Sequence, residues 1–238
     1  MVFAITNCNA QDIKQYCTDW NTIDSLITIK QIDKDEAVKK INEFSKKLKA
    51  KLFSSKRDKN IFVFPLNSFG SIDSIRFFKG GKDYEDDKYD YFQGSNSIGH
   101  PAHDIIIDDK DKDLNDDITG KPVDVVSVSY GIVIAINITW QPGSLLRGGK
   151  YVKVYDPDNN RIWYYSHLSV VSLFPGDTIN AGDKIGEVGR SGRRAILKEG
   201  STHLHIGTLK LVDGYPLPED YFEKLRSSYL KIKATTPK

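Results

Sequence analysis

The stretch "GSTHLHIGTLKL", residues 200–211, places two histidines two positions apart in a run that otherwise reads as a β-strand. Successive side chains of a strand point to opposite faces, so His203 and His205 are expected to share one face while Leu204 turns to the other. The chain has only five histidines, and this pattern directs two of them into one space. The pair therefore predicts a chemical site on the surface of a β-sheet.

The rest of the chain from Ile61 onward has the pattern of an antiparallel β domain. Short runs of β-branched and aromatic residues alternate with clusters of Gly, Pro, Asn and Asp. The runs are "IFVF", "SIRFF", "DIIID", "DVVSVS", "GIVIAINITW", "YVKVYD" and "RIWYYSHL". Residues 79–99 are polar, rich in Gly and Tyr, and without periodicity, which predicts one long loop that leads into His100.

An amphipathic helix is predicted over residues 33–53. Asp33 is a suitable N-cap, and Glu36 follows it by three positions. Apolar residues recur at helical spacing at Val38, Ile41, Phe44, Leu48 and Leu52. Residues 1–58 are thus predicted to form an N-terminal helical extension with a supporting role, since they offer no chemical groups at a recognisable spacing.

The C-terminal segment, residues 216–238, has the features of a short closing helix. Pro218 stands where a first helical turn tolerates it. Tyr221, Leu225 and Tyr229 then repeat every four residues. The predicted organisation is a helical extension over 1–58, a mainly β domain over 59–215, and a C-terminal helix and tail over 216–238.

Composition limits the classes of function. The 238 residues are 39% hydrophobic, which is enough for a globular core. The formal net charge of +2 gives no electrostatic argument for binding nucleic acid or an anionic membrane. No run approaches the ~18–20 apolar residues of a transmembrane helix, so no membrane span is predicted.

The N-terminal residues leave two questions open. The opening "MVFAITNCNAQ" fits either the stub of a trimmed signal peptide or an ordinary N-terminus. Cys8 and Cys17 are the only cysteines, and they lack a zinc-binding spacing. They form either one local disulfide in an exported protein or two unpaired thiols.

A second cluster of chemical groups lies in "GHPAHDIIIDD", residues 99–109. If the segment is extended, His100 and Asp104 share a face and His103 points the other way. His100 and Asp104, together with one histidine of the 203/205 pair, would give two imidazoles and a carboxylate, a ligand set suited to catalytic zinc. His167, at the end of "RIWYYSHL", and the remaining imidazole would then be candidate general bases or transition-state donors.

Each of two charged stretches is either a binding site or a set of solvent-exposed residues without a specific function. Asp109, Asp111 and Asp113 alternate as in a calcium-binding EF-hand loop, but Leu114 replaces the turn glycine and Gly120 the bidentate Glu. A solvated acidic turn over residues 108–117 is therefore predicted in preference to a calcium site. The arginines before the histidine pair are either a basic rim for an acidic substrate or loop residues that aid solubility. They are Arg190, Arg193 and Arg194.

Three motifs in order carry a family resemblance. They are His100-x-x-x-Asp104, Tyr165-x-His167-Leu168 and His203-x-His205. From about Ile61 to Leu211 the chain resembles the lysostaphin/LytM-type zinc metallopeptidases, whose signature is H-x(3)-D, Y-x-H-L and H-x-H. Residues 174–192, "FPGDTINAGDKIGEVGRSG", are similar to the glycine-punctuated hairpin of that family.

The resemblance implies a fold, a metal site and a substrate. It implies a barrel-like LytM catalytic domain (a duplicated hybrid motif) and one Zn²⁺ per chain, bound by His100, Asp104 and His205. His167 and His203 would be the catalytic histidines, one taking the proton of water and the other donating to the oxyanion, in an order left open. The implied activity is that of an endopeptidase on peptidoglycan peptides, in the periplasm or secreted.

Two other functions fit parts of the pattern. A LytM-like regulator that activates another cell-wall hydrolase would share the fold but lack ligands or catalytic histidines, whereas all five positions are intact here. A carrier or phosphotransfer module would use Lys184 or a phosphorylated His, but it leaves His100 and Asp104 unexplained. In the peptidase, loops 79–99 and 189–202 are expected to wall a groove in which tyrosines either contact the peptide or pack the loop. Those tyrosines are Tyr84, Tyr89 and Tyr91.

Overall fold

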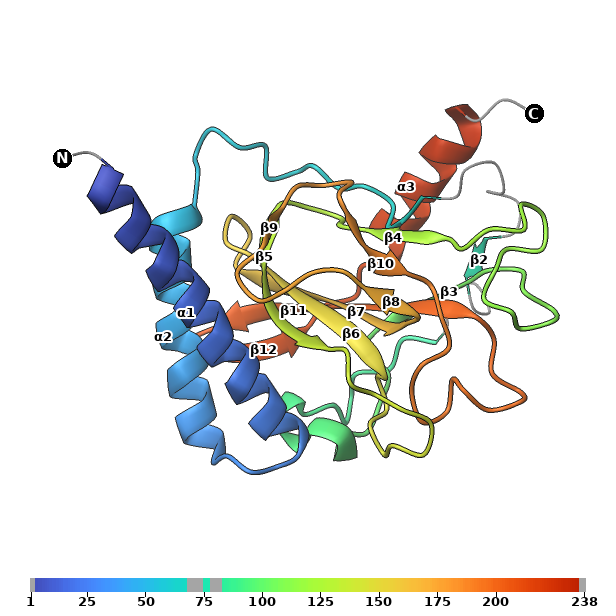
Figure 1. Ribbon diagram of the computed structural model, residues 1–238, viewed down its shortest axis with the longest axis horizontal. Helices are drawn as coiled ribbons and strands as arrows, with labels where there is room; N and C mark the ends of the chain where they lie inside the picture. Colours follow the sequence, from blue (N-terminus) through green and yellow to red (C-terminus); the bar gives the residue numbers. More distant parts are fainter. Residues whose placement is uncertain (1–2, 68–74, 78–82, 236–238) are drawn as a thin grey trace.

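The computed structural model describes residues 3–67, 75–77 and 83–235, with side chains described from Ala10 onward. The first residues of the predicted signal stub, residues 79–82 of the predicted loop and the tail 236–238 lie outside the described residues. Figure 1 shows the N-terminal helices on one side of the β-sheets and the C-terminal helix on the other. The predicted arrangement of antiparallel sheets with N-terminal helices and a C-terminal helix is thus confirmed.

Antiparallel pairing joins the described strands into two sheets. The larger has the order β2-β3-β11-β7-β6-β5-β9, with β12 paired to β11. Its strands are β2 (Arg76–Phe77), β3 (His103–Ile106), β5 (Gly131–Asn137), β6 (Lys150–Asp156), β7 (Arg161–Leu168), β9 (Thr178–Ile179), β11 (His203–Val212) and β12 (Tyr215–Pro218). The smaller, ordered β1-β4-β10-β8, consists of β1 (Leu66–Asn67), β4 (Asp124–Val126), β10 (Lys184–Glu187) and β8 (Val170–Val171).

The described helices are α1 (Phe3–Thr28), α2 (Lys34–Leu52), the 3-10 helix η3 (Tyr91–Asn96) and α3 (Phe222–Thr235). The predicted helix over 33–53 and the closing helix are present, but η3 lies within the predicted loop 79–99, and Pro218 ends β12 instead of entering the first turn of α3. The carboxylate of Asp33 caps α2 by accepting the backbone N–H groups of Asp35 and Glu36, at 2.9 and 3.2 Å. This cap satisfies two donors that the first turn would otherwise leave unpaired, so α2 begins where the sequence predicts.

The local disulfide is wrong, because both cysteines belong to one helix. Cys8 and Cys17 lie nine positions apart in α1, and a rise of 1.5 Å per residue puts their Cα atoms roughly 13 Å apart, beyond the reach of a disulfide. Cys17 is a free, buried thiol.

Two hydrophobic cores lie on the two faces of the large sheet. The side chains of β6 contribute to both cores. Val152 and Val154 pack toward the small sheet and α3, whereas Tyr155 packs toward α1 and α2. Trp20 of α1 and Ile41 of α2 are fully buried in this second core. The N-terminal helices therefore share a core with the sheet, and the division of the chain at residues 58 and 215 stays a prediction.

The predicted hairpin over residues 174–192 is wrong. β9 pairs with β5 in the large sheet, whereas β10 pairs with β4 and β8 in the small one. The carboxylates of Asp177 and Asp183 accept the backbone N–H groups of Phe174 and Asn180, which makes two local turns. The segment thus crosses from one sheet to the other, because these turns do not oblige the flanking strands to pair with each other.

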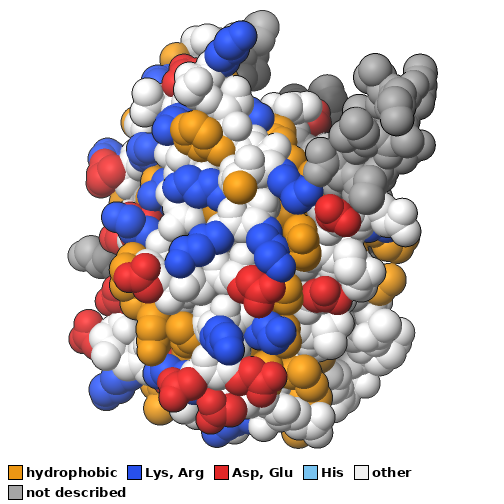
Figure 2. Space-filling view, turned by 90° about the vertical axis from the view of Figure 1, so that its left-hand side faces the viewer, with side chains coloured by type: hydrophobic (Ala, Val, Ile, Leu, Met, Phe, Trp, Pro, Cys, Tyr) orange, Lys and Arg blue, Asp and Glu red, His pale blue; other side chains and the backbone are white. Residues whose placement is uncertain are grey.

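The surface on the side of α1 and α2 carries both signs of charge. Figure 2 shows Lys and Arg side chains over much of this face with Asp and Glu side chains among them, in keeping with a formal net charge of +2. In the part of the chain that the structure describes, no helix is both long and apolar enough to cross a membrane.

Candidate metal centre and active site

Adjacent strands β3 and β11 bring Asp104 and the two histidines of β11 together. Asp104 is the registered partner of His205, which also pairs with Ser166 of β7. The Asp104 carboxylate lies 3.1 Å from Nδ1 of His205 and 3.8 Å from Nε2 of His203. Leu204 is fully buried on the other face of the sheet. The prediction that His203 and His205 share a face is therefore confirmed.

His100 approaches the same point from a loop before β3. Its backbone forms a bridge with Glu85, and Nε2 of its ring lies 3.0 Å from Nδ1 of His205 and 3.3 Å from Oδ1 of Asp104. One ligand atom from each of His100, Asp104 and His205 thus lies within 4.8 Å of the others. Strand β3 begins only at His103, so the predicted common face of His100 and Asp104 arises without a continuous strand.

Asp83 holds this group in position, and sequence reasoning did not select it. Its backbone carbonyl accepts a hydrogen bond from Nδ1 of His100 at 2.8 Å, and its carboxylate accepts the backbone N–H of Asp104 at 2.8 Å. A carbonyl oxygen only accepts, so the His100 proton is on Nδ1 and the lone pair is on Nε2. The stretch around Asp83 holds several other acidic residues, and nothing in their spacing distinguishes this one.

His103 points away from the site, as its parity predicts. The ring is 2% exposed, its Nε2 lies 2.9 Å from Oδ1 of Asp220, and it stacks on Tyr84 with 5.4 Å between ring centroids. This packing uses the ring of Tyr84, which is absent from the pocket wall among the described residues. Tyr84 thus packs within the protein, whereas Tyr89 and Tyr91 line the pocket.

A β-bulge at His167 turns this side chain toward the metal site. Lys150 of β6 pairs with Leu168, but the next residue, Tyr151, pairs with Ser166, so His167 is the extra residue of β7. Its φ of 63° lies in the left-handed region that non-glycine residues rarely adopt. Gly148 accepts the His167 backbone N–H at 3.0 Å. The irregular backbone at this position re-aims the imidazole.

The protons of His167 and His203 have fixed positions. Nδ1 of His167 donates to the carbonyl of Ser191 at 2.6 Å, and Nδ1 of His203 donates to the carbonyl of Ser201 at 2.7 Å. Because each acceptor is a carbonyl, both rings keep an unprotonated Nε2 when they are neutral. A Cβ at Gly192 would lie 2.7 Å from Nδ1 of His167, so glycine is required beside this ring. The two ring centroids are 4.7 Å apart.

The electrostatics of the site keep Asp104 ionised and favour the neutral forms of His167 and His205. Burial opposes ionisation of Asp104, but hydrogen bonds from His100 and His205 hold its pKa far below the usual range. Burial lowers the pKa of His205 and lowers that of His167 well below its ordinary value. Burial also acts against protonation of His100, but Asp104 and the Asp83 carbonyl raise its pKa overall.

This donor set fits a divalent zinc ion. Two imidazole nitrogens face one another at 3.0 Å beside an ionised carboxylate, and a cation bound between them would use all three as ligands. The hydrogen bond from the other nitrogen of His100 to Asp83 is the kind of outer contact that fixes the tautomer of a ligating histidine. The three ligands that the resemblance implied therefore lie together, and the two histidines that it implied as catalytic lie beside them.

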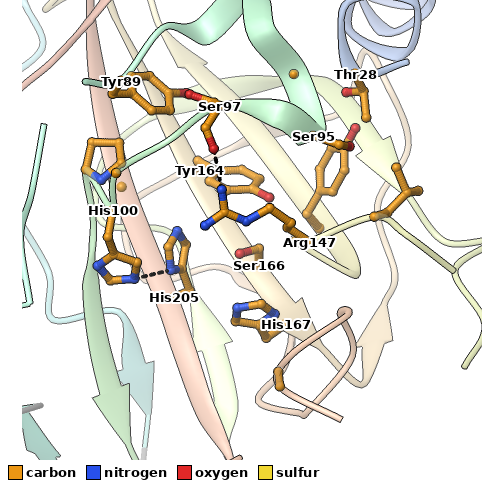
Figure 3. A pocket seen from close by; sticks show the side chains of 18 of the residues that line it. Thr28, Tyr89, Ser95, Ser97, His100, Arg147, Tyr164, Ser166, His167 and His205 are labelled. Atoms are coloured by element: carbon orange, nitrogen blue, oxygen red, sulfur yellow. Dashed lines mark hydrogen bonds between the residues drawn. The ribbon is translucent and has the colours of Figure 1, made fainter. Parts of the chain in front are cut away.

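The site opens into a pocket of about 400 Å³. Loops 79–99 and 189–202 both contribute to its wall, as expected, and the C-terminal end of α1 closes one side. Figure 3 shows side chains from these segments around the histidines. The lining includes Ile27, Thr28, Tyr89, Tyr91, Ser97, Arg147, Tyr164 and Arg194. Sequence reasoning missed Thr28 and Arg147, since no local pattern relates either to the distant histidine motifs.

The three arginines of loop 189–202 have different positions. Arg190 is 8% exposed and its guanidinium donates to the carbonyl of Leu197 at 2.6 Å, so it braces the loop from inside. Arg194 lines the pocket, whereas Arg193 is exposed and outside the pocket wall. A basic rim made of all three is therefore wrong.

The other charged motifs do not form the arrangements that rival functions need. Both carboxylate oxygens of Asp113 accept hydrogen bonds from Asn115, so Asp113 does not join Asp109 and Asp111 as in an EF-hand. The carboxylates within 4.8 Å of one another are instead those of Asp109, Asp111 and Asp117, two of them exposed. Lys184 pairs with Asp124 and Glu187, at 2.6 and 2.9 Å.

Comparison with known proteins agrees with the fold and the motifs. Residues 117–216 match the model of peptidase family M23, so this segment belongs to that family, as the resemblance implied. The matched segment contains His167, His203 and His205, whereas His100 and Asp104 precede it. None of the curated proteins matches the sequence.

Solved structures give the fold of a larger part of the chain. A candidate glycyl-glycine endopeptidase lytM from Ruminococcus gnavus is 19% identical with a TM-score of 0.50, over 89% of this chain and 87% of that one. The catalytic domain of the antimicrobial peptidase lysostaphin from Staphylococcus simulans is 20% identical with a TM-score of 0.43. The match covers 65% of this chain and 95% of that domain.

A zinc-containing peptidase from Vibrio cholerae is 21% identical with a TM-score of 0.41 over 66% of this chain. This chain spans only 39% of the length of that protein. At such identities the similarity concerns the fold alone, and the activity must be argued from the site.

Proposed function

We propose that this protein is a zinc metallopeptidase that hydrolyses peptide bonds in the stem or cross-bridge peptides of peptidoglycan. The observation that carries the proposal is the convergence of His100, Asp104 and His205 beside two histidines whose Nε2 atoms are free. Membership of family M23 over residues 117–216 supports the same activity. A protein that only used the fold for binding would have no need for all five groups at once.

His100, Asp104 and His205 would hold the zinc ion through Nε2, a carboxylate oxygen and Nδ1. Zinc at this position supplies Lewis acidity toward the amide carbonyl and makes water a nucleophile near neutral pH. Asp83 keeps the ring of His100 and the backbone of Asp104 in position for that role. Three protein ligands also leave room for water and substrate at a tetrahedral ion.

His167 and His203 would share the proton transfers. Burial favours neutral His167, and a neutral Nε2 can accept the proton of the attacking water. Nε2 of His203 lies 3.8 Å from the Asp104 carboxylate, which places this ring beside the candidate metal site as the donor to the developing oxyanion. The proton must then reach the departing amine, so new amino groups are the expected product.

A cell-wall substrate follows from the family resemblance and suits the shape of the pocket. Tyr89, Tyr91 and Tyr164 give its wall flat aromatic surfaces, which suit an extended peptide. Since peptidoglycan lies outside the cytoplasm, a periplasmic or secreted location is part of the proposal. The bond cut would be a D-amino-acid cross-link or a bond in a glycine-containing bridge.

Digestion of purified sacculi tests this function. Zinc-loaded protein should release new amino groups and shorter peptides while the glycan strands stay uncut, as read by mass spectrometry. The His167→Ala and His203→Ala variants are matched controls that keep the three metal ligands. Cleaved glycosidic bonds would contradict the proposal, and unchanged muropeptides would favour a regulator that acts on another hydrolase.

A further inference from the structure

Arg147 extends into the pocket from the loop between β5 and β6. Its guanidinium Nη1 donates to the backbone carbonyl of Ser97, from the opposite wall of the pocket. Figure 3 shows this side chain reaching toward Ser97, with His205, His100 and His167 around the same space. Within the described residues, that hydrogen bond is the guanidinium's one polar contact, and no carboxylate forms an ion pair with it.

The loop that carries Arg147 is also the loop that positions His167. The next residue, Gly148, accepts the backbone N–H of His167 at 3.0 Å, and the carbonyl of Leu146 accepts that of Arg193 at 3.1 Å. A Cβ at Gly192 would lie 2.4 Å from the Arg147 carbonyl, which shows how closely the two loops pack. The arginine and the candidate catalytic histidine thus have a fixed spatial relation.

The charge of the pocket favours an anionic ligand group. Among the described residues of its wall, Asp104 is the one acidic side chain, and it belongs to the candidate metal site. Lys153 also lines the pocket, but its ammonium is paired with the buried carboxylate of Asp24. Arg147 is therefore a cation whose charge nothing in the described wall balances.

We propose that Arg147 is the anchor for a carboxylate of the peptide substrate. An arginine has five N–H donors in a planar fork, and carboxylates bind such a fork through two parallel hydrogen bonds. Ser97 occupies one donor and holds the fork in place, so the remaining donors are available at little entropic cost. The inference rests on the proposed peptidase function and adds a substrate class, namely peptides with a free carboxylate near the scissile amide.

Two sources could supply that carboxylate in a cell-wall peptide, the C-terminus of the peptide or an acidic side chain. Synthetic cross-linked stem peptides, which contain the proposed scissile amide, distinguish them when both carboxylates are free and when each is amidated in turn. Wild-type protein is expected to lose activity when one particular carboxylate is amidated and to tolerate amidation of the other. Equal kcat/KM values for all three peptides would overturn the anchor and leave the peptidase function standing.

Variants of Arg147 test whether this residue is the source of the preference for a free carboxylate. Arg147→Gln should raise KM for the preferred peptide about 10- to 100-fold with little change in kcat, because a charged hydrogen-bonded pair is lost. It should leave KM for the amidated peptide unchanged, and Arg147→Lys should restore part of the affinity. Arg193→Gln is the matched control, since Arg193 is an exposed neighbour outside the pocket wall.

A binding measurement separates failure of the anchor from failure of the peptidase function. If no cross-linked peptide is cleaved, the proposed function fails, and calorimetric titration with the same peptides still tests the anchor. Tighter binding of the free carboxylate to wild type than to Arg147→Gln supports it. Equal binding to the two proteins, with thermal unfolding unchanged, overturns it.

Discussion

Replacing Asp24 with asparagine would leave the ammonium of Lys153 buried without a counter-charge. Asp24 lies in α1 and is 1% exposed, and Lys153 lies in β6 and is 9% exposed. The Asp24 carboxylate accepts hydrogen bonds from Lys153 and from the hydroxyls of Tyr91 and Tyr151, the last two at 2.6 and 2.8 Å. This cluster connects the N-terminal helix to the floor of the pocket.

The size of the effect follows from the burial of both partners. Removing one member of a buried ion pair costs about 3–5 kcal/mol, because the remaining charge stays desolvated. The side-chain amide oxygen that Asp24→Asn introduces can still accept from the tyrosines, so the lower end of that range, about 3 kcal/mol, is expected. In a chain of this size each kcal/mol lowers Tm by about 2–4 °C, which gives a decrease of roughly 6–12 °C.

Urea unfolding followed by circular dichroism measures the loss, with thermal unfolding as a second readout. Asp19→Asn on the same helix is the matched control, because Asp19 is only partly buried, its hydrogen bond with Gln15 is exposed, and its change should alter stability by less than about 0.5 kcal/mol. The Asp24→Leu, Lys153→Met double variant should be more stable than the sum of the single losses implies. A loss below about 1 kcal/mol for Asp24→Asn would refute the argument that this pair holds α1 against the sheet.

The remaining predictions concern the two candidate catalytic histidines and the buried thiol. His167→Ala and His203→Ala should each retain zinc while turnover falls on the order of 10²–10³-fold. Elemental analysis measures the zinc content, and peptide assays measure the turnover. Loss of zinc from either variant would show that the replaced histidine is a metal ligand. Burial raises the pKa of Cys17 to about 12, so its thiolate is scarce below that pH. In a Cys8→Ser variant, a thiol reagent at pH 8 should therefore label the protein only after unfolding; rapid labelling of the native chain would contradict the burial of Cys17.

Period-two alternation was sufficient to predict much of the metal site. It placed His203 and His205 on one face of β11 and turned His103 away from Asp104, because these residues lie in regular strands. The cap at Asp33 likewise predicted the start of α2, since capping depends on neighbouring residues alone. Features set by local geometry were thus readable without the structure.

His167 shows where counting along a strand fails. Ser166 lines the pocket, and regular alternation would turn the next side chain to the opposite face. The bulge at His167 adds a residue to β7 and brings both side chains to the pocket. Strand alternation alone therefore could not place the His167 side chain, which its position at the end of a strand-like run and the family motif had singled out.

Contacts between distant segments were beyond prediction for a different reason. Asp83, Thr28 and Arg147 reach the site through loop conformation and helix packing, which depend on the whole fold. The turn residues of segment 174–192 are compatible with a hairpin and with a crossover between sheets. The sequence therefore could not predict which strands β9 and β10 pair with. The pocket wall accordingly required the structure, whereas the histidine motifs did not.

The zinc content of protein purified without added metal tests the central claim most directly. Elemental analysis should find one zinc per chain in the wild type and in His103→Gln, since His103 faces Asp220 on the other side of β3. The His100→Ala, Asp104→Ala double variant should lose the metal, because only His205 of the three proposed ligands remains. Stoichiometric zinc in that double variant, or its loss from His103→Gln alone, would contradict the metal centre described above.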